Sequence, residues 1–166
     1  MKKARADGII FFPAAVLLFI GSLYLIVHST DLFEFGAVLS NTSETNVSTD
    51  RKEIAEYIQT MLFFFLGILS GIGLLAGKKW GWLLGVPCLG IYLVVAIRGL
   101  YLSVVANMLN EGGMVFIAVC GVLCICLTIL LLPSSFKKLR IKSSLLIPAA
   151  FIFLLLLILF AYTQIN

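Results

Sequence analysis

Five long apolar runs limit this chain to one class of fold. A bilayer core of roughly 30 Å needs about 20 helical residues to cross it, so a run of that order with few charges predicts a membrane-spanning helix. Such runs cover residues 8–27, 58–76, 82–108, 113–132 and 145–162. They are continuous rather than alternating, which argues against the strands of a membrane barrel. The sequence therefore predicts an all-α integral membrane protein, a bundle of five transmembrane helices.

The composition agrees with a lipid environment. Of the 166 residues, 61% are hydrophobic and 12% are charged, and the mean hydropathy is +1.13. This is more apolar surface than a soluble core of that length would bury. Because the apolar runs extend through the whole chain, we expect a single transmembrane domain over residues 1–166, surrounded by membrane lipid.

The distribution of basic residues predicts the orientation. The connection over residues 28–56 holds two of them, Arg51 and Lys52. Nine others precede the first run or lie between runs two and three or runs four and five: Lys2, Lys3, Arg5, Lys78, Lys79, Lys137, Lys138, Arg140 and Lys142. The positive-inside rule then puts the N-terminus in the cytoplasm and the C-terminus outside. We expect the net charge of +4 to reflect this topology and contact with anionic lipid, with no nucleic-acid partner.

The first run also resembles a secretory signal, since basic residues precede it. Its apolar stretch is about twice as long as a signal core and no A-x-A-like site follows, so we interpret it as an uncleaved anchor. The turn over residues 78–82, Lys-Lys-Trp-Gly-Trp, has charges for the headgroups and indoles for the interface, as membrane anchors do. Turns of this kind occur in many small bacterial membrane proteins, and we expect the bacterial inner (cytoplasmic) membrane.

The connection over residues 28–56 is the one sizeable hydrophilic segment, and we expect it outside. Asp50 and Glu53 have capping-box spacing, which predicts that the second helix begins at about Arg51, before its apolar run. Asn41 and Asn46 begin N-x-S/T sequons, which chance favours in a segment this rich in Asn, Ser and Thr. Glycosylation there, which would require a eukaryotic source, is the alternative that stays open.

Glycines at four-residue spacing surround the basic turn. They are Gly67, Gly71, Gly73, Gly77, Gly81 and Gly85. Small residues one turn apart let two helix backbones approach closely inside a membrane. The pattern favours a close-packed hairpin of runs two and three, and the same motif also forms dimer faces, an alternative that stays open. Residues 151–160 hold neither glycine nor a polar side chain, so we expect them to face lipid or a partner protein.

Arg98 is the one charge well inside an apolar run, and such residues are costly enough to be functional candidates. It lies about 24 Å along the helix from the interface at Trp82, within snorkelling distance of the outer surface. We predict either snorkelling, including pairing with Glu34, Glu56 or Glu111, or a ligand or partner contact. Tyr101, on the same helix face, and Asn107, near the outer end, complete this candidate site.

The cysteines and the single histidine do not form a metal or redox motif. Cys120 and Cys124 are one helical turn apart, without the second pair or the histidine spacing that zinc sites use. Free cysteine packs as a small hydrophobe, so we expect Cys88, Cys120, Cys124 and Cys126 to be buried packing thiols. We expect no metal and no cofactor, and an interfacial His28 at the end of the first run.

The expected function follows from the chemistry that these runs lack. None of the five runs contains an Asp, Glu or His that would carry protons, and no inverted repeat is evident. No nucleophile has a base beside it in the sequence. We therefore expect a non-enzymatic accessory subunit or interaction partner in a membrane protein complex, bound to other membrane proteins or to itself. The alternative is a small oligomeric transporter, channel or lipid-handling protein.

Overall fold

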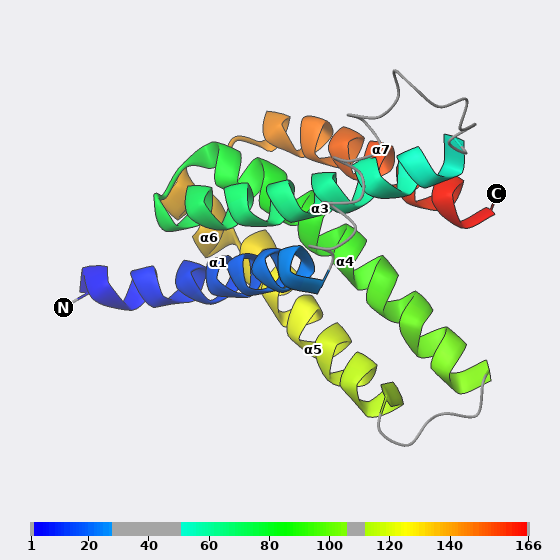
Figure 1. The fold of residues 1–166 in the computed structure, drawn as a ribbon. Coiled ribbons are helices and arrows are strands. Elements are labelled where there is room, and N and C mark those ends of the chain that lie inside the picture. The colour runs from blue at the N-terminus through cyan, green and yellow to red at the C-terminus, as the bar shows by residue number, and fades with distance from the viewer. Residues whose placement is uncertain (1, 28–50, 106–111, 166) are drawn as a thin grey trace.

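Seven helical segments make up the computed structural model, which describes residues 2–27, 51–105 and 112–165 (Figure 1). In chain order they are α1 (Lys2–Val27), α3 (Arg51–Leu75), α4 (Lys79–Val105), α5 (Gly112–Leu131), α6 (Pro133–Leu139), the 3-10 helix η1 (Ser143–Leu145) and α7 (Leu146–Ile165). These ranges contain no strand.

Five of these segments are long and apolar enough to cross a membrane. They are Gly8–Val27, Ala55–Leu75, Lys79–Val105, Gly113–Leu131 and Ser143–Gln164. The predicted class and number of helices are thereby confirmed, with boundaries that differ by a few residues. The start of α3 at Arg51, before its apolar run, also agrees with the sequence. The side of the membrane on which each terminus lies remains a prediction.

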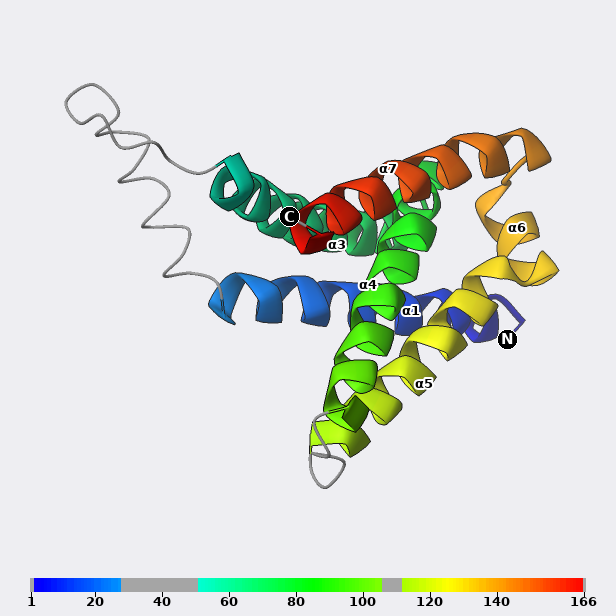
Figure 2. The same cartoon turned by 90° about the vertical axis from the view of Figure 1, so that its right-hand side faces the viewer.

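Helix α4 is the centre of the bundle, because it packs against α3, α5 and α7. Helix α1 packs on α3 and, less extensively, on α5. The core between them contains large, fully buried side chains such as Leu17, Phe63, Trp82 and Leu89. Figures 1 and 2 show that the C-terminal end of α4 and the N-terminal end of α5 diverge from the other long helices.

The basic segments gather at one end of the molecule. The N-terminus of α1, the turn between α3 and α4, and α6 lie together at the left of Figure 1. Lys78, Lys79, Lys138 and Arg140 line one pocket there. We call this the basic end, and we call the opposite end, with the first turn of α3 and the last turn of α7, the far end.

Helix α6 was not predicted, because seven residues are too few for a periodic pattern to stand out. It begins at Pro133, in the first helical turn, where a missing N–H costs nothing. The Phe136 ring packs edge-on against Trp82, with ring centroids 5.2 Å apart. The Trp82 indole donates a hydrogen bond to the carbonyl oxygen of Leu130 at 2.8 Å. Together these contacts fix the end of α5 and the start of α6 against α4.

Candidate functional site

The candidate site suggested by Arg98 lies near the far end, where α3 and α7 are joined by a polar contact. The Thr163 hydroxyl of α7 donates to Gln59 Oε1 of α3 at 2.5 Å, with the carbonyl oxygen of Phe160 as a second acceptor at 2.9 Å. Gln164 Nε2 donates to the same hydroxyl at 3.4 Å. Gln59 and Thr163 are both buried. Lipid offers a buried amide no partner, so this contact satisfies groups that would otherwise be costly there.

Arg98 of α4 lies over an aromatic ring of α7. Its guanidinium carbon is 5.7 Å from the centroid of the Phe160 ring, a distance typical of a cation–π contact. Phe160 is one turn before Thr163, so Arg98 is next to the polar contact between α3 and α7. The sequence had not suggested Phe160 as a neighbour, because spacing along the chain does not tell which helix lies opposite Arg98.

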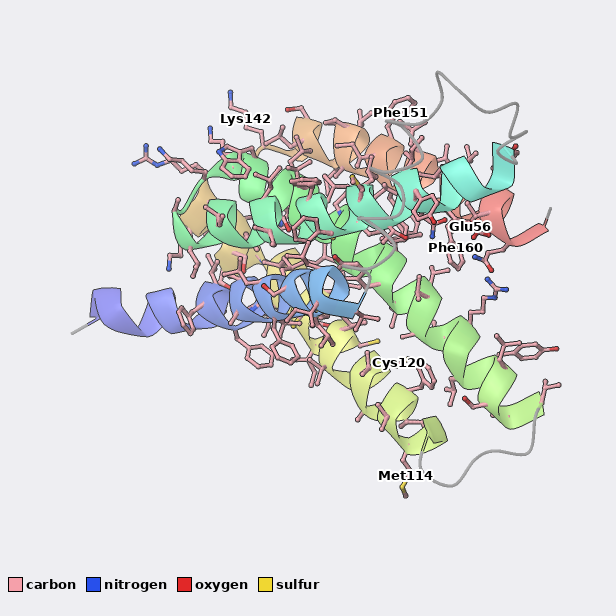
Figure 3. All side chains as sticks on the ribbon, in the orientation of Figure 1. Glu56, Met114, Cys120, Lys142, Phe151 and Phe160 are labelled. Carbon is pink, nitrogen blue, oxygen red and sulfur yellow. The ribbon has the colours of Figure 1, made fainter. Side chains whose placement is uncertain are left out.

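Of the three carboxylates predicted to pair with Arg98, the structure describes one, that of Glu56. Figure 3 labels Glu56 on α3 and Phe160 on α7, both toward the far end. Glu56 is exposed, and among the described residues no ion pair joins it to Arg98. Glu34 and Glu111 lie outside the described residues.

Tyr101 and Asn107 are the other two residues of the predicted site. Tyr101 is 65% exposed and follows Arg98 by one turn, on the outside of α4. Asn107 lies outside the described residues. The structure therefore brings Arg98 to Phe160 of α7, one turn before Thr163, rather than to a polar cluster on α4 itself. A signal for Gln59 and Thr163 did exist, since Gln59 is a polar residue inside the second apolar run and Thr163 directly follows the fifth.

The glycines predicted to pack helices face two different neighbours. An added Cβ at Gly67 would lie 2.5 Å from the Tyr92 hydroxyl, and one at Gly71 would lie 2.6 Å from Leu18 Cγ of α1. An added Cβ at Gly73 would lie 2.7 Å from the Cα of Gly81, across the hairpin of α3 and α4. A dimer contact at these buried positions would have to displace α1 or α4.

The remaining two glycines of the series, Gly77 and Gly85, make no such close contact between helices. Gly77 ends α3 with a φ of 64°, a left-handed conformation that suits glycine. An added Cβ at Gly85 would make ordinary contacts of 3.4 Å with Leu17 and Leu74. The four-residue spacing therefore covers one turn and two helix interfaces rather than one continuous face.

The cysteines are spread over the molecule. Cys88 and Cys126 are buried and Cys120 is half-buried, but Cys124 is exposed on α5, so the prediction of a buried thiol was wrong there. Cys124 is on the outside because α5 packs against its neighbours through Leu123, Cys126 and Leu130. In the described ranges, no three His, Cys, Asp or Glu side chains come together as a metal site would need. His28, Asn41 and Asn46 lie outside those ranges.

The five long helices have the length and the apolar composition of the spanning helices of α-helical membrane proteins. Comparison with known protein families, with curated proteins and with solved structures finds no match.

Proposed function

We propose that this chain is a non-enzymatic accessory subunit of a membrane protein complex, and that the outer part of the α4–α5 hairpin binds the partner. The observation that carries the proposal is the burial pattern along α4. All buried residues of α4 lie between Gly81 and Ala96. From Ile97 to Val105 none is buried, although the helix continues for more than two turns.

Helix α5 accompanies α4 over the same stretch and is exposed in the same way. Between Met114 and Val122 it has no buried residue. The two helices hold each other there, since an added Cβ at Gly99 would collide with the Phe116 ring. The Ser103 hydroxyl is satisfied locally, because it donates to the carbonyl oxygen of Gly99 at 2.9 Å, within α4. In the part of the chain that the structure describes, this outer hairpin (residues 97–105 and 114–122) therefore has two apolar faces and few neighbours.

A stripe on α4 is the part of this hairpin that best fits a partner helix. Ile97, Tyr101 and Val104 follow the spacing i, i+4, i+7 and are 53%, 65% and 44% exposed. Arg98 flanks the stripe and supplies a charge that lipid tails would not favour. A helix packed on the stripe would offer van der Waals contact along its length and a polar partner for Arg98 or Tyr101.

The orientation and the membrane are part of the same proposal. We place the basic end on the cytoplasmic side because four basic side chains line one pocket there and the positive-inside rule assigns such an end to the cytoplasm. The N-terminus would then be cytoplasmic and the C-terminus outside. The bacterial inner membrane is the location we expect, so the outer hairpin would meet its partner in the outer half of that bilayer.

The proposal is tested by gentle extraction of the protein from the native membrane into nanodiscs. The mass and the identity of every co-purifying chain are then determined. We expect a foreign polypeptide at fixed stoichiometry. Lipid adapts to a larger side chain whereas a packed interface does not, so Val104→Phe should release that polypeptide while leaving the amount of inserted protein unchanged. Leu155→Phe is the matched control, since Leu155 is 50% exposed on α7.

Two results would contradict the proposal. Purification of the chain as a monomer or as a homo-oligomer, with no foreign polypeptide, would remove the subunit role and favour the transport or lipid-handling alternative. Retention of the foreign polypeptide by Val104→Phe, together with its loss in Leu155→Phe, would place the interface on α7 rather than on the hairpin.

A further inference from the structure

The basic end contains an open pocket that is not part of the candidate site and that the proposed function uses only to assign the orientation. It has a volume of about 660 Å³ and is formed by two turns that are distant in the sequence. The turn between α3 and α4 contributes Lys78 and Lys79, and the end of α6 contributes Lys138 and Arg140. We call it the headgroup pocket. The sequence suggested a membrane anchor at the first turn alone, and the folded chain adds two cations from the opposite wall.

The backbone at this pocket also favours an anion. Lys79 and Trp80, the first two residues of α4, line it, so the N-terminal end of a long helix, which carries partial positive charge, lies at the pocket. Arg140 ends α6 at φ 51° and ψ 42°, a left-handed conformation that is unfavourable for a residue with a Cβ. This turn puts Arg140 in the same wall as Lys138. Arginine binds phosphate oxygens through two parallel N–H groups, and lysine adds a point charge.

A second, apolar pocket follows along the same helices, since Leu145 lines the headgroup pocket and the next residue, Leu146, lines this one. It has a volume of about 270 Å³ and lies between α4, α5 and α7. Along α4 the lining passes from Lys79 and Leu83 in the headgroup pocket to Val86 and Gly90 in the second one. Along η1 and α7 the lining passes from Leu145 in the headgroup pocket to Ala149, Ala150 and Phe153 in the second one. We call this second pocket the chain groove, since both helices lead it away from the basic end and toward the middle of the bundle.

We propose that these two pockets together bind one anionic glycerophospholipid, with its phosphate in the headgroup pocket and an acyl chain in the chain groove. The headgroup pocket has the chemistry to bind a phosphate anion. Either a lipid or a free phosphate ester can supply that phosphate. The adjoining groove favours the lipid, because a water-soluble phosphate ester leaves its apolar walls uncovered. The basic charge therefore has a defined site in addition to a general attraction to anionic membranes.

The test compares lipid retention by the full chain in nanodiscs that contain phosphatidylglycerol in a phosphatidylcholine background. After the protein is released from the nanodiscs, native mass spectrometry counts how many lipids of each headgroup type remain bound to it. We expect one retained phosphatidylglycerol per chain, and a roughly tenfold lower retention in Lys79→Gln/Arg140→Gln. The control is Lys137→Gln/Lys142→Gln, which removes the same charge from exposed residues of the basic end that do not line the pocket. Lys142 is labelled in Figure 3.

Further arms separate the possible sources of the phosphate. Ala150→Phe fills the chain groove and should lower phosphatidylglycerol retention, while Ala118→Phe, at an exposed residue of α5, should leave it unchanged. In nanodiscs of phosphatidylcholine alone, glycerol phosphate should not raise the melting temperature of the protein. The lipid proposal would be overturned if glycerol phosphate raised the melting temperature, Lys79→Gln/Arg140→Gln abolished that rise, and Ala150→Phe did not change lipid retention. These results together would identify a free phosphate ester as the ligand. Equal losses in both double variants would reduce the site to general surface attraction and would overturn it as well.

Discussion

Two glycines determine how closely α3 and α4 approach. Gly73 and Gly81 face each other beside the tight turn, and both are buried. An added Cβ at Gly81 would collide with the backbone of Gly73 and Leu74, and backbone atoms cannot move aside as the end of a flexible side chain can. Inside a membrane, van der Waals contact of this kind replaces the hydrophobic effect as a source of helix association.

Gly81→Ala should therefore destabilise the protein although alanine is the better helix former. We expect a loss of about 1–3 kcal/mol in the free energy of unfolding, the usual cost of overpacking. Titration of the purified protein with a denaturing detergent measures it. The control is Gly121→Ala on α5, where an added Cβ meets nothing within 4 Å. Equal stability of Gly81→Ala and the wild type would show that the two helices are farther apart than described.

At the scale of elements, α3 and α7 depend on a polar contact that no apolar pattern predicts. Gln59 and Thr163 are 104 residues apart and meet at the far end. Interhelical hydrogen bonds in membranes contribute about 0.6 kcal/mol on average and about 1.7 kcal/mol at most. This contact is therefore a modest but specific contribution to the position of the last helix.

A double-mutant cycle with Gln59→Met and Thr163→Val should give a coupling energy of about 0.6–1.7 kcal/mol in the free energy of unfolding. Both replacements keep the side-chain volume close to that of the original residue. Ser103→Ala serves as the comparison, because the Ser103 hydroxyl bonds to the backbone of its own helix and should not couple to Gln59. Additive effects of Gln59→Met and Thr163→Val would mean that the two side chains do not interact.

The elements differ in how far their sequence predicts them. The five long helices were found because each needs about 20 apolar residues, a signal that is independent of their neighbours. Arg98 shows the limit of this approach: a charge in an apolar run signals a contact, but Phe160 comes from α7 and no spacing on α4 points to it. The same holds for Arg140, whose left-handed turn brings it to the basic turn between α3 and α4. Local patterns predicted the helices, and contacts between distant residues needed the folded chain.

At the scale of the whole molecule, the two ends of the bundle differ in their chemistry. The basic end has four cations around one pocket, while the far end has a buried amide–hydroxyl contact and an arginine over an aromatic ring. In a bilayer with a positive-inside bias this asymmetry corresponds to one orientation. In the proposed orientation, the proposed lipid site and the proposed partner surface lie in opposite halves of the same bilayer.

The most direct test of this account is the accessibility of single introduced cysteines at the two ends. Lys142→Cys lies at the basic end and Gln164→Cys at the far end, and both positions are exposed. The wild type, whose four cysteines all lie in α4 and α5, is the background control. In intact cells a membrane-impermeant maleimide should label Gln164→Cys and leave Lys142→Cys unlabelled, and permeabilised cells should show both labelled. Labelling of both positions in intact cells, or of Lys142→Cys alone, would contradict the five-span topology or its orientation.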